Sequence, residues 1–362
     1  MKKLLALVCI LSISIIRCHS ADINVARSQS VLDSHLKKSN YKLGEIDYSL
    51  SEKELFYKGL ILLNIDYDIL TAERIFRYLA TKYPTNSEYL YCAGRAAFFV
   101  GEYNYFPNIR DSYDIAFDNF EKALKLDPKT KYYMLMKSYT LGRIGLFIRR
   151  EKGGLLSGSK ELYASMALID EILEVEDIWS LDANYMDVIL ARGNVEEEAL
   201  LTRGEVLKGM PGILGGSEDM AIRIYKYVAK KRPDNMRAHL LLGKYYHSKG
   251  KQKLAIEEYA KVQRIFDSGK APQSPEVDQM MAFLPRNLGN VYWAQGKYKK
   301  AFRQFKLNVK RRPTSSSGHE WMGHYYKRIG KKEKAIRSYK KAVYYSKWNS
   351  SARDNLAQLQ KK

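Results

Sequence analysis

Apolar and small residues recur at helical spacing in the C-terminal half of the chain. Between positions 288 and 294 they lie three or four apart, which predicts one apolar face of a helix. Gly296 would end that helix, and a second apolar face follows it. The sequence therefore predicts a hairpin of two helices. The positions that define this unit are Leu288, Gly289, Tyr292, Gly296, Ala301, Phe305 and Pro313.

The same unit recurs along the chain. The central glycines of two copies, Gly289 and Gly323, are 34 residues apart. One further complete copy precedes them, and three more stretches keep only the second half, an alanine, an aromatic residue four positions later and a proline. The complete copies add Leu242, Gly243, Tyr246, Gly250, Ala255, Tyr259, Met322, Gly323, Tyr326, Gly330, Ala335, Tyr339 and Ala342. The partial copies are Ala72, Phe76 and Pro84; Ala116, Phe120 and Pro128; and Ala221, Tyr225 and Pro233.

This pattern resembles the tetratricopeptide repeat (TPR) family, whose period is 34 residues. The resemblance is specific over residues 216–348, fair over 57–128 and weak between them. It implies an all-α fold, a right-handed solenoid of antiparallel helix pairs with a divergent helical N-terminal half.

The departures from the period suggest how the chain is divided. Gly243 lies 46 residues before Gly289, which places a loop insertion near 267–275, and about ten extra residues surround 104–107. We expect five segments. They are a signal peptide (1–20), an N-terminal extension (21–50), a divergent TPR-like region (51–210), a TPR solenoid (211–348) and a C-terminal capping helix (349–362).

Positive charge is concentrated in the C-terminal part of the chain. Residues 221–362 carry 34 Lys or Arg against 9 Asp or Glu, whereas residues 1–220 carry 27 against 31. A basic field of this size attracts anionic partners, such as an acidic protein or peptide segment, anionic lipid, glycan or small carboxylates. Nucleic acid is not expected, because the chain begins like an exported protein.

Register within the resemblance predicts a binding groove. First helices of successive TPR pairs line the concave side in this family, so a partner would meet the exposed positions of these helices. Arg286 and Asn290, four apart, resemble half of the carboxylate clamp that some members use for acidic peptide ends. Ser317 and Trp321 stand where further clamp residues would be expected. The predicted groove residues are Arg237, Lys244, His247, Arg286, Asn290, Trp293, His324 and Lys327.

The first twenty residues have the pattern of a bacterial-type secretory signal. Lys2 and Lys3 precede an apolar run over residues 4–16, which is too short for a permanent membrane anchor. Cleavage after Ser20 is one interpretation, and attachment of lipid to Cys18 is the other. Arg17 fits a lipoprotein signal poorly, which favours cleavage. Both place the mature protein in the periplasm or cell envelope.

Patterns for catalysis are weak. His319 and His324 resemble a zinc-protease motif, but they are five residues apart and therefore point to different sides of a helix. The acidic stretch between Asp170 and Glu198 offers paired carboxylates for a glycan-processing enzyme, although acidic faces of exposed helices are commoner. No enzyme activity, cofactor or metal is expected.

A second resemblance concerns residues 210–217, where a proline and paired glycines lead into a helix. This step is similar to periplasmic TPR components associated with TRAP solute transporters, which implies binding of small anionic solutes. The favoured hypothesis remains an exported TPR scaffold or adaptor that binds an acidic or extended partner in its basic concave groove.

Overall fold

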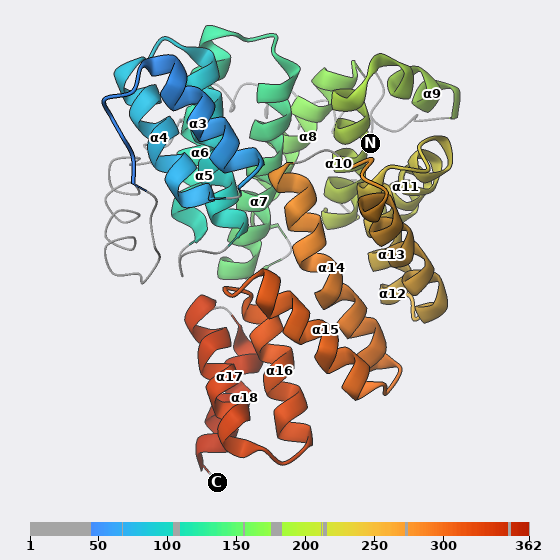
Figure 1. Ribbon diagram of the computed structural model, residues 1–362. Coiled ribbons are helices and arrows are strands. Elements are labelled where there is room, and N and C mark those ends of the chain that lie inside the picture. Colours follow the sequence, from blue (N-terminus) through green and yellow to red (C-terminus); the bar gives the residue numbers. More distant parts are fainter. Residues whose placement is uncertain are drawn as a thin grey trace.

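The fold is entirely helical over the part of the chain that can be described. The computed structural model describes residues 45–361 apart from 67, 104–108, 155, 175–182, 211, 213–215, 272–273 and 347–348. Within these ranges it has 16 α-helices and no strand (Figure 1), which confirms the predicted all-α class. The helices are α3 (Glu52–Asn64), α4 (Ile69–Lys82), α5 (Ser87–Glu102), α6 (Ile109–Leu126), α7 (Lys131–Lys152), α8 (Ser159–Leu173), α9 (Ala183–Arg192), α10 (Asn194–Gly209), α11 (Glu218–Lys231), α12 (Met236–Ser248), α13 (Gln252–Asp267), α14 (Pro275–Ala294), α15 (Tyr298–Arg311), α16 (Ser316–Arg328), α17 (Lys332–Tyr345) and α18 (Ser350–Lys361).

Several predicted features lie outside the described residues. These are the signal segment with Cys18, most of the 21–50 extension, the extra residues at 104–107, and residues 211 and 213–215 of the glycine-rich step. Among the described helices, none has the length and apolar character needed to cross a membrane.

Successive helices pack in pairs, and the pairs stack into a solenoid. The pairs are α3 with α4, α5 with α6, α7 with α8, α10 with α11, α12 with α13, α14 with α15, and α16 with α17. Helix α18 packs against α17 and α16 at the C-terminal end. The solenoid curves so that α14 and α16 come back beneath α5 and α7 (Figure 1).

Each of six pairs is held by a glycine on the first helix and an aromatic ring on the second. A Cβ atom built on Gly289 would lie 2.4 Å from Cε1 of Phe305, a separation that real Cβ atoms do not adopt. The six aromatic side chains are at most 1% exposed. Only glycine lets the backbone of the first helix approach the ring this closely. The pairs are Gly59–Phe76, Gly94–Phe120, Gly204–Tyr225, Gly243–Tyr259, Gly289–Phe305 and Gly323–Tyr339.

The C-terminal pairs turn at a second kind of glycine. Gly250, Gly296 and Gly330 have φ of 71°, 71° and 73°, the left-handed conformation that commonly ends a helix. Beyond each turn the second helix begins within two residues of the glycine. The stop signal predicted at Gly296 is therefore present at three equivalent positions.

Two histidines hold the junctions between pairs. His239 and His319 each donate Nε2–H to a proline carbonyl oxygen, that of Pro233 at 3.0 Å and that of Pro313 at 2.8 Å. The third histidine of interest, His324, contacts the hydroxyl of Tyr339 through Nδ1 at 3.0 Å. In the described residues no group of three His, Cys, Asp or Glu side chains is placed to hold a metal ion.

We predict that Gly289→Ala destabilises the protein by about 1–3 kcal/mol, because the added methyl group overlaps the ring of Phe305. Gly142→Ala is the matched control. Gly142 lies inside α7, and its added Cβ would be 3.7 Å from Oγ of Ser165, an ordinary contact. The control should stabilise by up to about 1 kcal/mol, because alanine favours a helix over glycine. Urea unfolding measures the change in the free energy of unfolding for both variants, and equal changes would contradict the proposed role of Gly289.

Candidate binding site inside the superhelix

Helix α14 contacts the inner side of the first half of the solenoid. Arg95 of α5 binds Glu276 at the start of α14, with Nη2 and Oε2 2.9 Å apart, and also donates to Asn64. Tyr103, just after α5, donates its hydroxyl to Asp278 of α14. These partners are 175 and 181 residues apart in sequence. The inner surface is therefore a meeting point of distant repeats.

Glu102 lies at the centre of this contact. Its carboxylate accepts hydrogen bonds from Tyr113 (2.8 Å) and Gln279, and Nε of Arg143 lies 2.7 Å away. Its backbone carbonyl oxygen accepts a hydrogen bond from Arg312. Burial alone would raise the pKa of Glu102, but the charge of Arg143 and these hydrogen bonds outweigh burial and hold the pKa below its usual range.

A second charged network joins α7, α10 and α12. Arg237 forms ion pairs with Glu198 and Glu205, and its guanidinium lies 5.0 Å from the ring centre of Tyr139. The pKa of Glu205 is lowered to about 2, because the attraction of Arg237 and other cations overcomes its burial. The pKa of Lys244 is lowered to about 8, mainly by burial. Burial of these charges on the inner surface therefore costs free energy, and close pairing with opposite charges offsets that cost.

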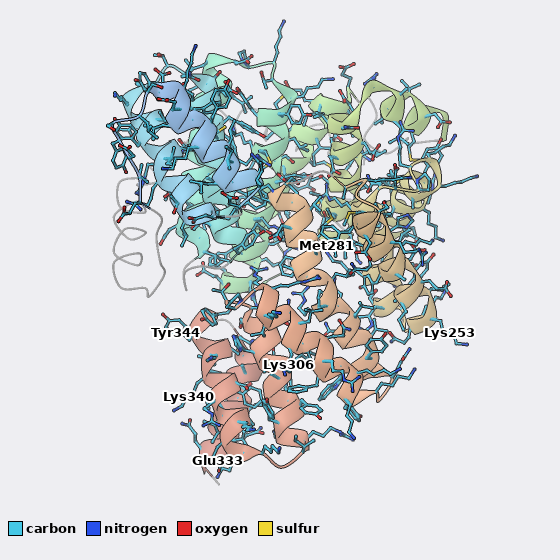
Figure 2. The ribbon with its side chains drawn as sticks, viewed as in Figure 1. Lys253, Met281, Lys306, Glu333, Lys340 and Tyr344 are labelled. Atoms are coloured by element: carbon cyan, nitrogen blue, oxygen red, sulfur yellow. The ribbon has the colours of Figure 1, made fainter. Side chains whose placement is uncertain are left out.

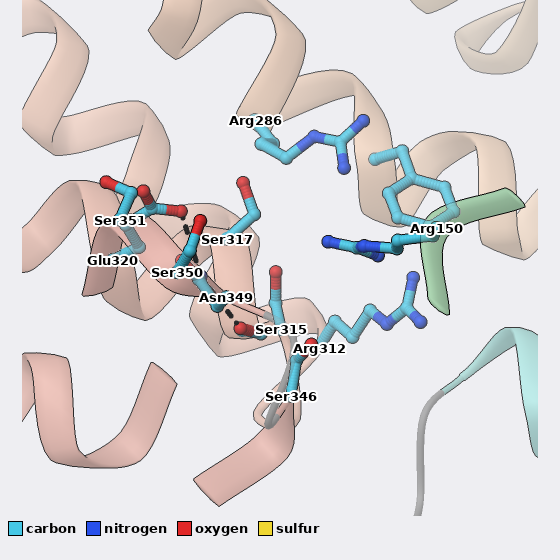
Figure 3. A pocket seen from close by; sticks show the side chains of 12 residues that line it. Arg150, Arg286, Arg312, Ser315, Ser317, Glu320, Ser346, Asn349, Ser350 and Ser351 are labelled. Atoms are coloured by element: carbon cyan, nitrogen blue, oxygen red, sulfur yellow. Dashed lines mark hydrogen bonds between the residues drawn. The ribbon is translucent and has the colours of Figure 1, made fainter. Parts of the chain in front are cut away.

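A pocket of about 450 Å³ opens where the C-terminal repeats meet the end of α7 (Figure 3). Arg150 comes from α7, Arg286 from α14, and Arg312 from the turn between α15 and α16. Figure 3 shows their guanidinium groups on one side and the serine side chains of α16 and α18 with Asn349 on the other. The pocket thus combines a cationic wall with a hydroxyl-rich wall.

The cationic wall is incompletely paired. Arg286 and Arg312 both lie against the ring of Phe283, with guanidinium carbons 4.8 and 4.4 Å from its centre. The Nε atom of each arginine is buried without a hydrogen-bond partner among the described residues. Burial lowers the pKa of Arg286, and burial lowers that of Arg312 to about 10 despite the nearby carboxylate of Glu102. Positive charge is therefore left over at this pocket.

The predicted groove residues stand in different settings. Lys244 and Arg286 lie inside and influence each other electrostatically, whereas Arg237 is already bound by two carboxylates. The other residues stand in separate settings. His247 contacts Gln252 at the end of its helix, Asn290 keeps a buried amide oxygen without a partner among the described residues, and Lys327 donates to Asn355 and Gln358 of α18.

Trp293 and His324 belong to an aromatic cluster between the last two repeats. The ring centre of Trp293 lies 5.1 Å from that of Trp321 and 4.8 Å from that of Tyr298. His324 is 5.1 Å from Trp321. Of the half clamp predicted at Arg286 and Asn290, Arg286 lines the pocket and donates to Asn287, whereas Asn290 is not among the residues that line it.

Acidic residues of the middle region mostly neutralise neighbouring cations. Asp170 accepts a hydrogen bond from the buried Arg203 at 2.9 Å, and Glu196 binds Lys131 at 2.8 Å. The same holds for Asp187 with Lys231, Glu197 with Arg232, and Glu198 with Arg237. These five carboxylates of the acidic stretch therefore have cationic partners, whereas Glu176, Asp177 and Asp182 lie outside the described residues.

The sequence did not single out Arg143, Arg150 or Arg312. Arg312 stands before Pro313 as Arg232 stands before Pro233, and that second arginine binds Glu197 on the outside of another repeat. The local sequence is therefore the same for Arg232, which lies on the outside, and Arg312, which lies on the inside. Their positions differ because α14 returns towards α5, and no local sequence pattern predicts that return.

Two models of the tetratricopeptide repeat family match the chain, over residues 219–275 and 318–347. The chain contains tetratricopeptide repeats. None of the curated proteins matches it. The matches do not support the resemblance of residues 210–217 to components of TRAP transporters.

Two solved structures are similar to this chain. Human IFIT1, solved as a dimer with m7Gppp-AAAA, is 13% identical with a TM-score of 0.57, and the match covers 92% of this chain and 67% of that one. A tetratricopeptide repeat protein from Parabacteroides merdae is 14% identical with a TM-score of 0.48, covering 85% of this chain and 98% of that one. The similarity to IFIT1 establishes a helical-repeat architecture for the TPR protein.

The inner network predicts a specific pH dependence. Because the pKa of Glu205 falls from 4.5 in the unfolded chain to about 2, its ionised form stabilises the fold above pH 4.5. That contribution is lost as the pH falls from 4.5 towards 2. Glu205→Gln should therefore unfold more easily at pH 7, by about 1 kcal/mol, since the 38% exposed side chain is partly screened.

The loss of stability on acidification to pH 3 should then be smaller in this variant than in the native protein. Urea unfolding at pH 7 and pH 3 measures this difference, with exposed Glu333→Gln as the matched control. An acid response of the Glu205 variant equal to that of the native protein would contradict the assigned role.

Proposed function

We propose that the TPR protein is an interaction scaffold of the cell envelope that docks an acidic partner protein on the outer face of its last repeats. The repeat family supports a scaffold, because stacked helix pairs present large surfaces for other proteins. The observation that carries the proposal is a set of exposed cations on α15 and α17, the second helices of consecutive pairs. We call this set the C-terminal basic face.

The C-terminal basic face is almost entirely of one sign. Glu333 is the single acidic residue on the two helices, and no member of the face forms an ion pair with any described side chain. Lys306 and Lys340 mark its two helices in Figure 2. Its members are Lys299, Lys300, Arg303, Lys306, Lys310, Lys334, Arg337, Lys340 and Lys341, all exposed. Such a field raises the rate at which an acidic surface associates.

The concave groove is a less accessible route for the same partner. Arg237 would have to leave Glu198 and Glu205, and Lys327 would have to leave Asn355 and Gln358 of α18. A partner docked in the groove would have to replace these interactions with its own. Of the predicted groove, Arg286 keeps unsatisfied hydrogen-bonding capacity and opens to the pocket. The outer face therefore offers more unpaired charge than the groove.

We predict that charge reversal of the face abolishes docking. The triple variant Lys306→Glu, Lys310→Glu and Lys340→Glu should lose the partner that the native protein captures from envelope extract at low salt. The matched control reverses three exposed lysines of the first repeats, Lys53, Lys125 and Lys129, with the same change in net charge. Quantitative mass spectrometry of the captured proteins compares the native protein, the triple variant and the control variant. Capture that both triple variants lose equally would overturn the proposal, since general charge would then explain it.

The envelope location rests on residues 1–20. The lysines at positions 2 and 3, the apolar run and the small residue at Ser20 support export with removal of the segment. We therefore expect the mature protein to begin at Ala21, as measured by intact mass and N-terminal sequencing after fractionation. A diacylglycerol-modified N-terminus at Cys18 would show lipid anchoring instead, and retention of Met1 in the cytoplasmic fraction would contradict export.

A further inference from the structure

We propose that the pocket between α7, α14, α16 and α18 binds a doubly charged oxyanion of the phosphate or phosphate-monoester type. This pocket is separate from the C-terminal basic face, so the inference does not depend on the docking proposal.

The charge of the pocket fits a dianion. The residues that line it include three arginines, Arg150, Arg286 and Arg312, and one carboxylate, Glu320. Glu320 is also held from the side by Asn349, which donates to Oε2 at 2.9 Å, and by His324. The three positive charges against this one negative charge leave a surplus of two, which matches a group of charge −2.

Two helices begin at the hydroxyl-rich wall. Ser315 caps α16 by accepting a hydrogen bond from the backbone N–H of Gly318, and Asn349 caps α18 by accepting one from that of Ala352. Asn349 also donates to Oγ of Ser316 at 3.1 Å, which fixes the start of α18 beside the start of α16. Both helix N-termini border the pocket, and helix N-termini favour anions through their dipoles and uncommitted backbone N–H groups.

The arginines supply the independent evidence for a ligand. Arg312 is 3% exposed, and its Nε–H is buried without an acceptor among the described residues, as is the Nε–H of Arg286. A buried donor without a partner costs free energy that an acceptor in the pocket would recover. The guanidinium of Arg312 is held in place, because it packs on Phe283 and donates to the carbonyl oxygen of Glu102.

The arrangement favours a tetrahedral anion over a planar carboxylate. Guanidinium groups come from three different elements, and the starts of α16 and α18 supply donors from the opposite wall. A carboxylate has two oxygens in one plane and satisfies one fork-shaped arginine well. A phosphate presents at least three oxygens in different directions, so it can meet several arginines and the serine hydroxyls together.

Calorimetric titration of the mature protein at low salt tests the assignment with inorganic phosphate, glycerol 3-phosphate and succinate. We expect saturable 1:1 binding of a phosphate compound that is at least tenfold tighter than that of succinate. Tighter binding of glycerol 3-phosphate than of inorganic phosphate would identify a monoester as the natural form, whereas equal or weaker binding would identify the free anion. Both results support the pocket.

Variants locate the binding. Arg286→Gln and Arg150→Gln should each raise the dissociation constant at least tenfold, because each removes a charge-assisted hydrogen bond. Ser317→Asp should abolish binding by placing a carboxylate opposite the arginines. The matched control is Arg303→Gln on the outer face of α15, which should change the constant less than twofold. Thermal unfolding confirms that each variant is folded.

Three results would overturn the proposal. They are the absence of saturable binding by any phosphate compound, succinate binding as tightly as phosphate, and an effect of Arg303→Gln as large as that of Arg286→Gln.

Discussion

The close contact between a glycine and an aromatic ring is the interaction on which six of the seven described helix pairs depend. It brings the backbones of two helices together at one point, and the buried alanine one turn before the ring keeps the rest of the interface narrow. This contact recurs in six pairs from Gly59–Phe76 to Gly323–Tyr339, so these pairs share the same close approach of their two helices. Stacking of similar pairs then produces the solenoid without any contact between distant repeats.

The inner surface adds what stacking alone does not provide. Arg95, Glu102 and Tyr103 at the inner end of the second pair bind Glu276, Gln279 and Asp278 of α14. Arg312 joins this contact by donating to the carbonyl oxygen of Glu102, and it lies beside Arg286 on Phe283. The basic pocket is thus a product of the closure, whereas the C-terminal basic face follows directly from the strongly amphipathic pattern of α15 and α17. The pocket therefore depends on tertiary structure, whereas the C-terminal basic face depends on the local sequence of two helices.

The fold could be predicted from the sequence because its signals are local. Gly289, Ala301 and Phe305 fall at fixed spacings, and the structure buries each of them as expected. The first helices of the weaker copies were missed, since Gly59 and Gly204 lack the surrounding motif of the later copies. The pocket was missed for a different reason. Arg150 and Arg312 are 162 positions apart, and only the tertiary path of the chain brings them together.

The closure by α14 has a consequence for how this protein reaches its native state. An open solenoid can form its repeats in any order, with each nucleus growing by contacts between neighbours. Here the hydrogen bond from Thr314 to the carbonyl oxygen of Tyr103 spans 211 positions, and its formation requires four intervening helix pairs to be in place. Such long-range contacts raise the entropic barrier to folding. They also couple the two halves, so the chain should unfold in larger cooperative blocks than its repeat count alone suggests.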